Sequence, residues 1–83
     1  MIAEKIILWN TNYGEIKCNL KQVMIDQKVS LYQVCRLSGL KYEVVIKYYN
    51  NTITRFDSDV VAKLCFVLGC QPKDIIVYVL RNN

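Results

Sequence analysis

The sequence predicts a single, mainly α-helical domain of five short helices, preceded by a possible small β-hairpin. Its 83 residues leave no room for a second core, because a domain usually takes about 100 residues or more. Hydrophobic residues make up 53% of the chain, with one Pro and three Gly, which is too apolar for a disordered segment. Apolar residues then recur at helical spacing between residues that begin or end helices.

The N-terminal extension, residues 1–18, contains two strand-like segments separated by a turn. Residues 4–9 read Glu-Lys-Ile-Ile-Leu-Trp, a short apolar run. An Asn-rich cluster ends at Gly14, and apolar and polar residues then alternate from residue 15 to residue 20. This pattern favours a small hairpin between the two segments.

Two capping boxes predict where the first two helices begin. Asn19-x-x-Gln22 precedes a helix over residues 20–28, and Ser30-x-x-Gln33 precedes a second helix that ends at Gly39. Glycine suits the left-handed position that follows a helix. The second helix is expected to direct three residues inward: Val34, Cys35 and Leu37.

Three more helices are predicted after Gly39. Residues 41–49 form the third, with Val45, Tyr48 and Tyr49 as candidates for its inward side, and residues 50–54 a polar loop. Asp57 or Ser58 begins the fourth helix, which ends at Gly69, and Pro72 begins a fifth that runs to residue 80. The inward residues of the last two helices are Val61, Leu64, Cys65, Leu68, Ile75, Ile76 and Val79.

Several kinds of chemistry are excluded by what the chain lacks. It has no histidine, and its four cysteines form no Cys-x-x-Cys pair, so no nucleophile–histidine pair and no zinc framework is present. A glycine-rich phosphate loop is also absent. We therefore expect neither an enzyme nor a cofactor or metal site, and the cysteines are read as free thiols. The longest apolar run, residues 75–80, is too short for a membrane span, and no secretory signal pattern is present, which favours the cytoplasm.

Basic residues gather in the middle of the chain. The net charge is +4, and residues 17–55 hold seven basic and two acidic side chains, whereas the remainder holds four basic and five acidic. Residues 30–49 also have the form of a helix-turn-helix, two short helices joined by a Gly-containing turn. Packing of Val34 and Cys35 against Val45 would hold the third helix at an angle that suits the major groove of DNA.

Residues 19–80 resemble the Cro and lambda-repressor-like helix-turn-helix regulators, also called the XRE family. The matching stretches are 20–24, 37–40, 49–51 and 63–76, and the last is similar to a small phage and bacterial branch. The resemblance implies a five-helix lambda-repressor-like fold and a repressor-like regulator that binds double-stranded DNA in a sequence-specific manner as a homodimer.

The resemblance also implies a DNA-binding face. On the third helix the expected base-facing residues are Lys41, Tyr42, Glu43, Val44 and Lys47. Tyr32, at the start of the second helix, falls near a phosphate. The following loop falls on the DNA backbone through Asn50, Asn51, Thr52 and Arg55, although the two asparagines are equally compatible with a simple turn. The chain departs from the family pattern at Leu31, where Gln is common, and at Lys41, where Ser often caps the helix.

Two questions stay open at the level of sequence. The expected dimer surface is either on the last two helices, through Phe66, Val77 and Leu80, or on the N-terminal segment, through Ile6, Leu8 and Trp9. The alternative function is a protein-interaction module, antitoxin-like or anti-repressor-like, in which Tyr42, Val44 and Ile46 form an apolar patch. A DNA-binding protein is sensitive to salt, whereas an apolar contact is not.

Overall fold

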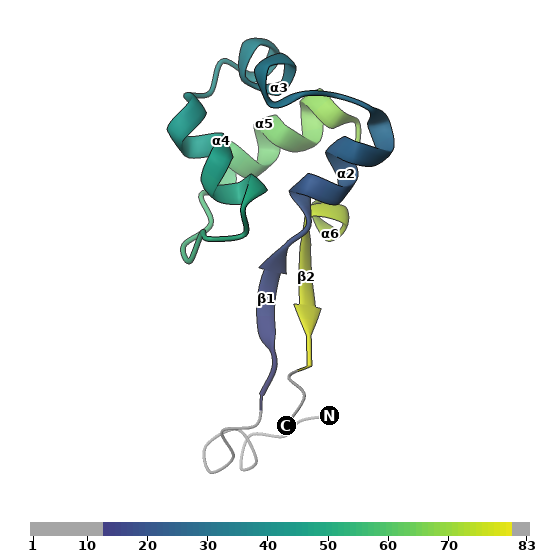
Figure 1. Cartoon of the computed structure of the whole chain (residues 1–83). Coiled ribbons are helices and arrows are strands. Elements are labelled where there is room, and N and C mark those ends of the chain that lie inside the picture. Colours follow the sequence, from purple (N-terminus) through teal and green to yellow (C-terminus); the bar gives the residue numbers. More distant parts are fainter. Residues whose placement is uncertain (1–12, 81–83) are drawn as a thin grey trace.

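The computed structural model describes residues 13–80, which form five helices and two strands. In chain order these are β1 (Glu15–Cys18), α2 (Leu20–Gln27), α3 (Leu31–Ser38), α4 (Tyr42–Tyr49), α5 (Ser58–Leu68), α6 (Pro72–Ile75) and β2 (Ile76–Val79). Figure 1 shows the helices gathered at one end and the two strands extending away from them as a narrow ribbon. The fold is therefore mainly α, as the sequence predicts.

One hydrophobic core joins the helices. Leu20 and Met24 come from α2, Val34 from α3, and the aromatic ring of Tyr48 from α4. The remaining buried residues are Cys18, Val45, Val61, Leu64, Leu68 and Ile75. Each fully buried aliphatic side chain contributes about 1.5–3 kcal/mol, so this small set supplies most of the apolar stabilisation.

The helix ends follow the predicted capping residues, with one exception. Ser30 and Gln33 exchange hydrogen bonds, and Asp57 accepts the N–H groups of two residues at the start of α5. The expected capping box at Asn19 is wrong, because its side chain makes no cap and Gln22 instead donates to Asp26 at 2.8 Å. The backbone N–H of Asn19 donates to the Ile75 carbonyl, which joins the start of α2 to α6.

The fifth helix is shorter than predicted. It begins at Pro72 as expected but ends at Ile75, and residues 76–79 form strand β2 instead. The segment Ile-Val-Tyr-Val consists of β-branched and aromatic residues, which fit a strand better than a helix. The prediction of helix to residue 80 is therefore wrong, and Val77 belongs to a strand while Leu80 follows it.

Strand β2 pairs with β1 in an antiparallel manner. The register places Ile16 opposite Tyr78 and Cys18 opposite Ile76. The second predicted strand of the hairpin is thus confirmed as a strand, but its partner in the structure comes from the other end of the chain. Residues 4–9, with Ile6, Leu8 and Trp9, lie outside the described residues.

Two residues expected to point inward do not reach the core. Leu37 is 61% exposed and Val79 is also exposed, whereas Cys65 is half-buried and packs against the core as predicted. Leu37 lies in the last turn of α3 and lines an open groove between α3 and α5, which leaves most of its side chain exposed. Over residues 13–80, no helix has the length and apolar character needed to cross a membrane.

Candidate nucleic-acid interface

Helices α3 and α4 form a helix-turn-helix with a tight turn. Gly39 has a φ of 75°, in the left-handed region, and its N–H donates to the Cys35 carbonyl at 2.9 Å. The Leu40 N–H then donates to the Ser38 hydroxyl at 3.1 Å. A side chain at residue 39 would meet no neighbouring atom but would strain the backbone, so glycine is required by conformation and not by space.

The predicted contacts across the turn place α4 against the core. Val34 and Val45 are both fully buried, and Cys35 is half-buried against the same cluster. Tyr48 is also buried, and its ring packs edge-on against Phe56 with centroids 5.8 Å apart. The inward side of α4 is thereby fixed, which leaves its other side for contacts outside the molecule.

The N-terminal end of α4 presents exposed polar side chains. Lys41 is the residue before the helix, and its side chain makes no capping hydrogen bond. Tyr42 is 57% exposed and Glu43 is also exposed. Val44 is half-buried and packs against the core, so it offers less surface than its neighbours. The first exposed turn therefore carries one cation, one phenol and one carboxylate.

The C-terminal end of α4 and the loop that follows contain the other predicted residues. Lys47, Asn50 and Arg55 are exposed. Thr52 donates from its backbone N–H and from its hydroxyl to the Lys47 carbonyl, at 3.0 and 3.4 Å. Asn51 is exposed, but its side-chain oxygen accepts the N–H of Cys18 at 2.7 Å. The loop is thus held in place by its own side chains.

The cations on α4 and in the loop that follows it form no ion pair within residues 13–80. The two pairs found there join Lys17 to Glu15 at 3.9 Å and Lys63 to Asp59 at 3.0 Å. The remaining cations near α4, including Lys41, Lys47 and Arg55, are exposed and outside these pairs. Their charge is available to an anionic partner.

Sequence reasoning missed one cation beside α4. The Lys21 ammonium of α2 lies 5.6 Å from the ring centroid of Tyr49, the last residue of α4. This cation–π contact brings a further positive charge to the C-terminal end of α4. The signal in the sequence was the position of Lys21 in the basic segment, but no local spacing links residues 21 and 49. Tyr32, which was predicted, is 73% exposed at the start of α3.

A comparison with known protein families matches residues 19–80 to a Cro/C1-type helix-turn-helix DNA-binding domain. The match covers most of the chain, including both helices of the turn motif and all of strand β2. The chain belongs to the Cro/C1-type family. No curated protein and no solved structure matches it.

The cysteines of this Cro/C1-type domain are free thiols. Burial raises the pKa of the Cys18 thiol. Burial and the neighbouring Cys65 raise the pKa of the Cys70 thiol to about 11, so Cys70 is protonated at neutral pH. A protonated thiol is a poor nucleophile and a poor metal ligand. Within residues 13–80, no group of three or more Cys, Asp or Glu side chains could hold a metal ion.

Proposed function

We propose that the protein is a sequence-specific regulator of transcription, repressor-like, that inserts α4 into the major groove of double-stranded DNA. One observation carries the proposal: α4 is fixed on its inward side by Val45 and Tyr48, while Lys41 and Lys47 on its outward side are exposed and outside the ion pairs of the described residues. A rigid helix with free cations is what groove insertion next to two phosphate chains requires. We propose that this regulator acts in the cytoplasm.

The N-terminal turn of α4 is the best candidate for base recognition. In this motif the start of the second helix reaches the base edges, and here it presents Lys41, Tyr42 and Glu43. Lysine can donate to guanine, and glutamate can accept from cytosine N4. Lys47 and the loop residues Asn50, Thr52 and Arg55 lie further along and are proposed to contact the backbone.

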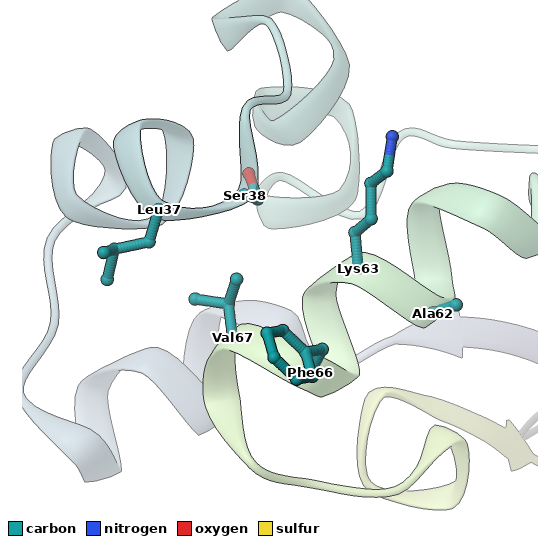
Figure 2. Close-up of a pocket in the computed structure, with 6 residues that line it drawn as sticks. All are labelled: Leu37, Ser38, Ala62, Lys63, Phe66 and Val67. Atoms are coloured by element: carbon teal, nitrogen blue, oxygen red, sulfur yellow. The ribbon is translucent and has the colours of Figure 1, made fainter.

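We also propose that the regulator is a homodimer. Phe66 is 88% exposed on α5 and borders an apolar groove of about 350 Å³. Figure 2 shows Leu37 of α3 opposite Val67 and Phe66 of α5 around this groove. Because the same surface contains both a protruding ring and a hollow, two copies related by a two-fold axis could fill each other's groove. Val77 and Leu80 lie on or next to the ribbon and offer a second surface.

Selection of bound sites from random duplex DNA tests the proposal directly. We expect an enriched site with two-fold symmetry and half-sites about one helical turn, roughly 34 Å, apart. A symmetric site supports both the DNA function and the dimer, and a single half-site supports DNA recognition by a monomer. Failure to enrich any sequence, together with binding to mixed DNA that does not change with salt, would contradict the proposal.

The residues that read bases are tested by repeating the selection with variants. Tyr42→Ala or Glu43→Gln should change the preferred base at one position of each half-site, with a loss of about 1–3 kcal/mol for each good contact. Tyr32→Ala is the matched control, because Tyr32 is also an exposed tyrosine but lies at the start of α3. An unchanged site in both α4 variants would show that these residues do not select sequence.

A further inference from the structure

Asn51 occupies a backbone conformation that usually belongs to glycine. Its φ is 59°, and it lies directly after Asn50, the C-cap of α4. The Asn51 N–H donates to the Tyr48 carbonyl at 3.3 Å, and the Thr52 N–H donates to the Lys47 carbonyl at 3.0 Å. These two bonds form the Schellman pattern, in which the left-handed residue is most often glycine.

The chain does use glycine at two other helix ends. Gly39 ends α3 and Gly69 ends α5, each with a positive φ. Asparagine tolerates this conformation better than most residues but less well than glycine. Lys28 also ends a helix with a positive φ, so this conformation does not by itself require glycine, and what distinguishes Asn51 is the contact that its side chain makes.

The side chain of Asn51 makes a contact that a glycine could not make. Its Oδ1 accepts the backbone N–H of Cys18 at 2.7 Å, although the two residues are 33 positions apart in the sequence. Cys18 is the last residue of β1 and its side chain is buried in the core. A glycine at position 51 would leave this N–H without its acceptor, at a place where water is partly excluded.

The backbone around Cys18 is fixed by two further interactions. Cys18 is opposite Ile76 in the ribbon, and the next residue, Asn19, donates its N–H to the Ile75 carbonyl. The hydrogen bond that Asn51 accepts from Cys18 thus connects the loop after α4 to a junction where β1, α2 and α6 meet. Figure 1 shows this loop between α4 and α5 descending toward the start of the ribbon.

We propose that Asn51 is a positioning residue for DNA binding: it fixes the loop of residues 50–57, and with it the C-terminal end of α4, against the junction at Cys18. The proposal rests on the proposed function, since the loop is taken to face the DNA backbone. Asn51 then increases affinity by holding Lys47 and Arg55 in place before DNA arrives, and not by binding a phosphate with its own amide group. A loop that is ordered beforehand loses less freedom on binding.

The experiment compares four variants of the full chain. Asn51→Gly keeps the left-handed conformation and removes the acceptor, whereas Asn51→Asp keeps an acceptor oxygen and adds a negative charge. Thr54→Asp adds the same charge three residues away, at an exposed position of the same loop that is not among the proposed DNA contacts. Lys28→Gly is the backbone control, because Lys28 also ends a helix with a φ of 59°.

Two measurements are made on each variant. The rate of amide hydrogen exchange at Cys18 shows whether the hydrogen bond between Cys18 and Asn51 is intact. A binding titration on the duplex selected by the wild-type protein gives the affinity for DNA. We expect Asn51→Gly to speed Cys18 exchange and weaken binding by about fivefold to tenfold, the factor that corresponds to one hydrogen bond. Asn51→Asp should keep Cys18 protected and lose no more affinity than Thr54→Asp. Lys28→Gly should leave Cys18 exchange unchanged.

Two results would overturn the proposal. Unchanged affinity in Asn51→Gly would show that the hydrogen bond between Asn51 and Cys18 does not contribute to DNA binding. A much larger loss in Asn51→Asp than in Thr54→Asp, with Cys18 still protected, would show that the amide group of Asn51 touches DNA directly. If the wild-type protein binds no duplex, the proposed function itself is contradicted. If the wild-type protein binds DNA but the variants do not differ as expected, only the role of Asn51 is contradicted.

Discussion

Replacement of Lys47 by alanine should reduce the salt dependence of DNA binding by a defined amount. Two cations proposed to contact the DNA backbone, Lys47 and Arg55, are exposed and outside the ion pairs of the described residues. Each cation that neutralises a phosphate contributes about −0.9 to the slope of log affinity against log salt. A dimer with two such contacts per subunit should have a slope of about −4 and lose on the order of 10² in affinity between about 50 and 200 mM salt.

Lys47→Ala removes one phosphate contact per subunit, so the negative slope of log affinity against log salt should become shallower by about 2 per dimer. Gel shifts on one selected duplex and on one mixed-sequence duplex, at four salt concentrations, measure this change. Lys73→Ala is the matched control, because Lys73 is also an exposed lysine but lies on α6, outside the proposed DNA-binding residues and outside the groove at Phe66. An unchanged slope for Lys47→Ala, or an equal change for Lys73→Ala, would refute the placement of α4 against the phosphates.

Three other changes test packing and assembly. Tyr48→Phe removes the hydroxyl that accepts the Asp57 N–H at 3.0 Å, so thermal unfolding should occur several degrees lower, for a loss of about 1 kcal/mol; an unchanged Tm would show that water replaces the hydroxyl. Gly14→Ala places a Cβ against the backbone carbonyl oxygen of Val79 and 2.9 Å from the Tyr78 ring, so urea unfolding should show a loss of about 1–3 kcal/mol, whereas equal stability would mean that the ribbon is not closely packed there. Phe66→Glu should convert a dimer to a species near 9.7 kDa in sedimentation, and a dimer of unchanged mass would place the interface elsewhere.

The helix-turn-helix could be predicted from the sequence because its signals are local. Ser30 and Gln33 are three residues apart, and Gly39 directly follows the helix that it ends. The burial of Val45 and Tyr48 follows from helical spacing within one short segment. Each of these features depends on residues that are neighbours in the sequence, where propensity and capping act directly.

The partner of β1 and the end of α6 could not be predicted in the same way. Residues 76–79 pair with a strand at the other end of the described chain, and local spacing contains no information on that pairing. The spacing of Ile75, Ile76 and Val79 also fits a helix, so only the β-branched composition of residues 76–79 indicated a strand. The acceptor role of Asn51 was missed for the same reason, since Cys18 is 33 residues away.

The ribbon also has a consequence for the order in which the chain folds. In the sequence, β1 precedes all five described helices and β2 follows them. Pairing of the two strands therefore closes a loop that contains almost the whole described chain. Closure of a long loop is entropically unfavourable unless its ends are first brought together. We therefore expect α2 to α5 to assemble before the strands meet, and substitutions in the ribbon to change the rate of unfolding far more than the rate of folding.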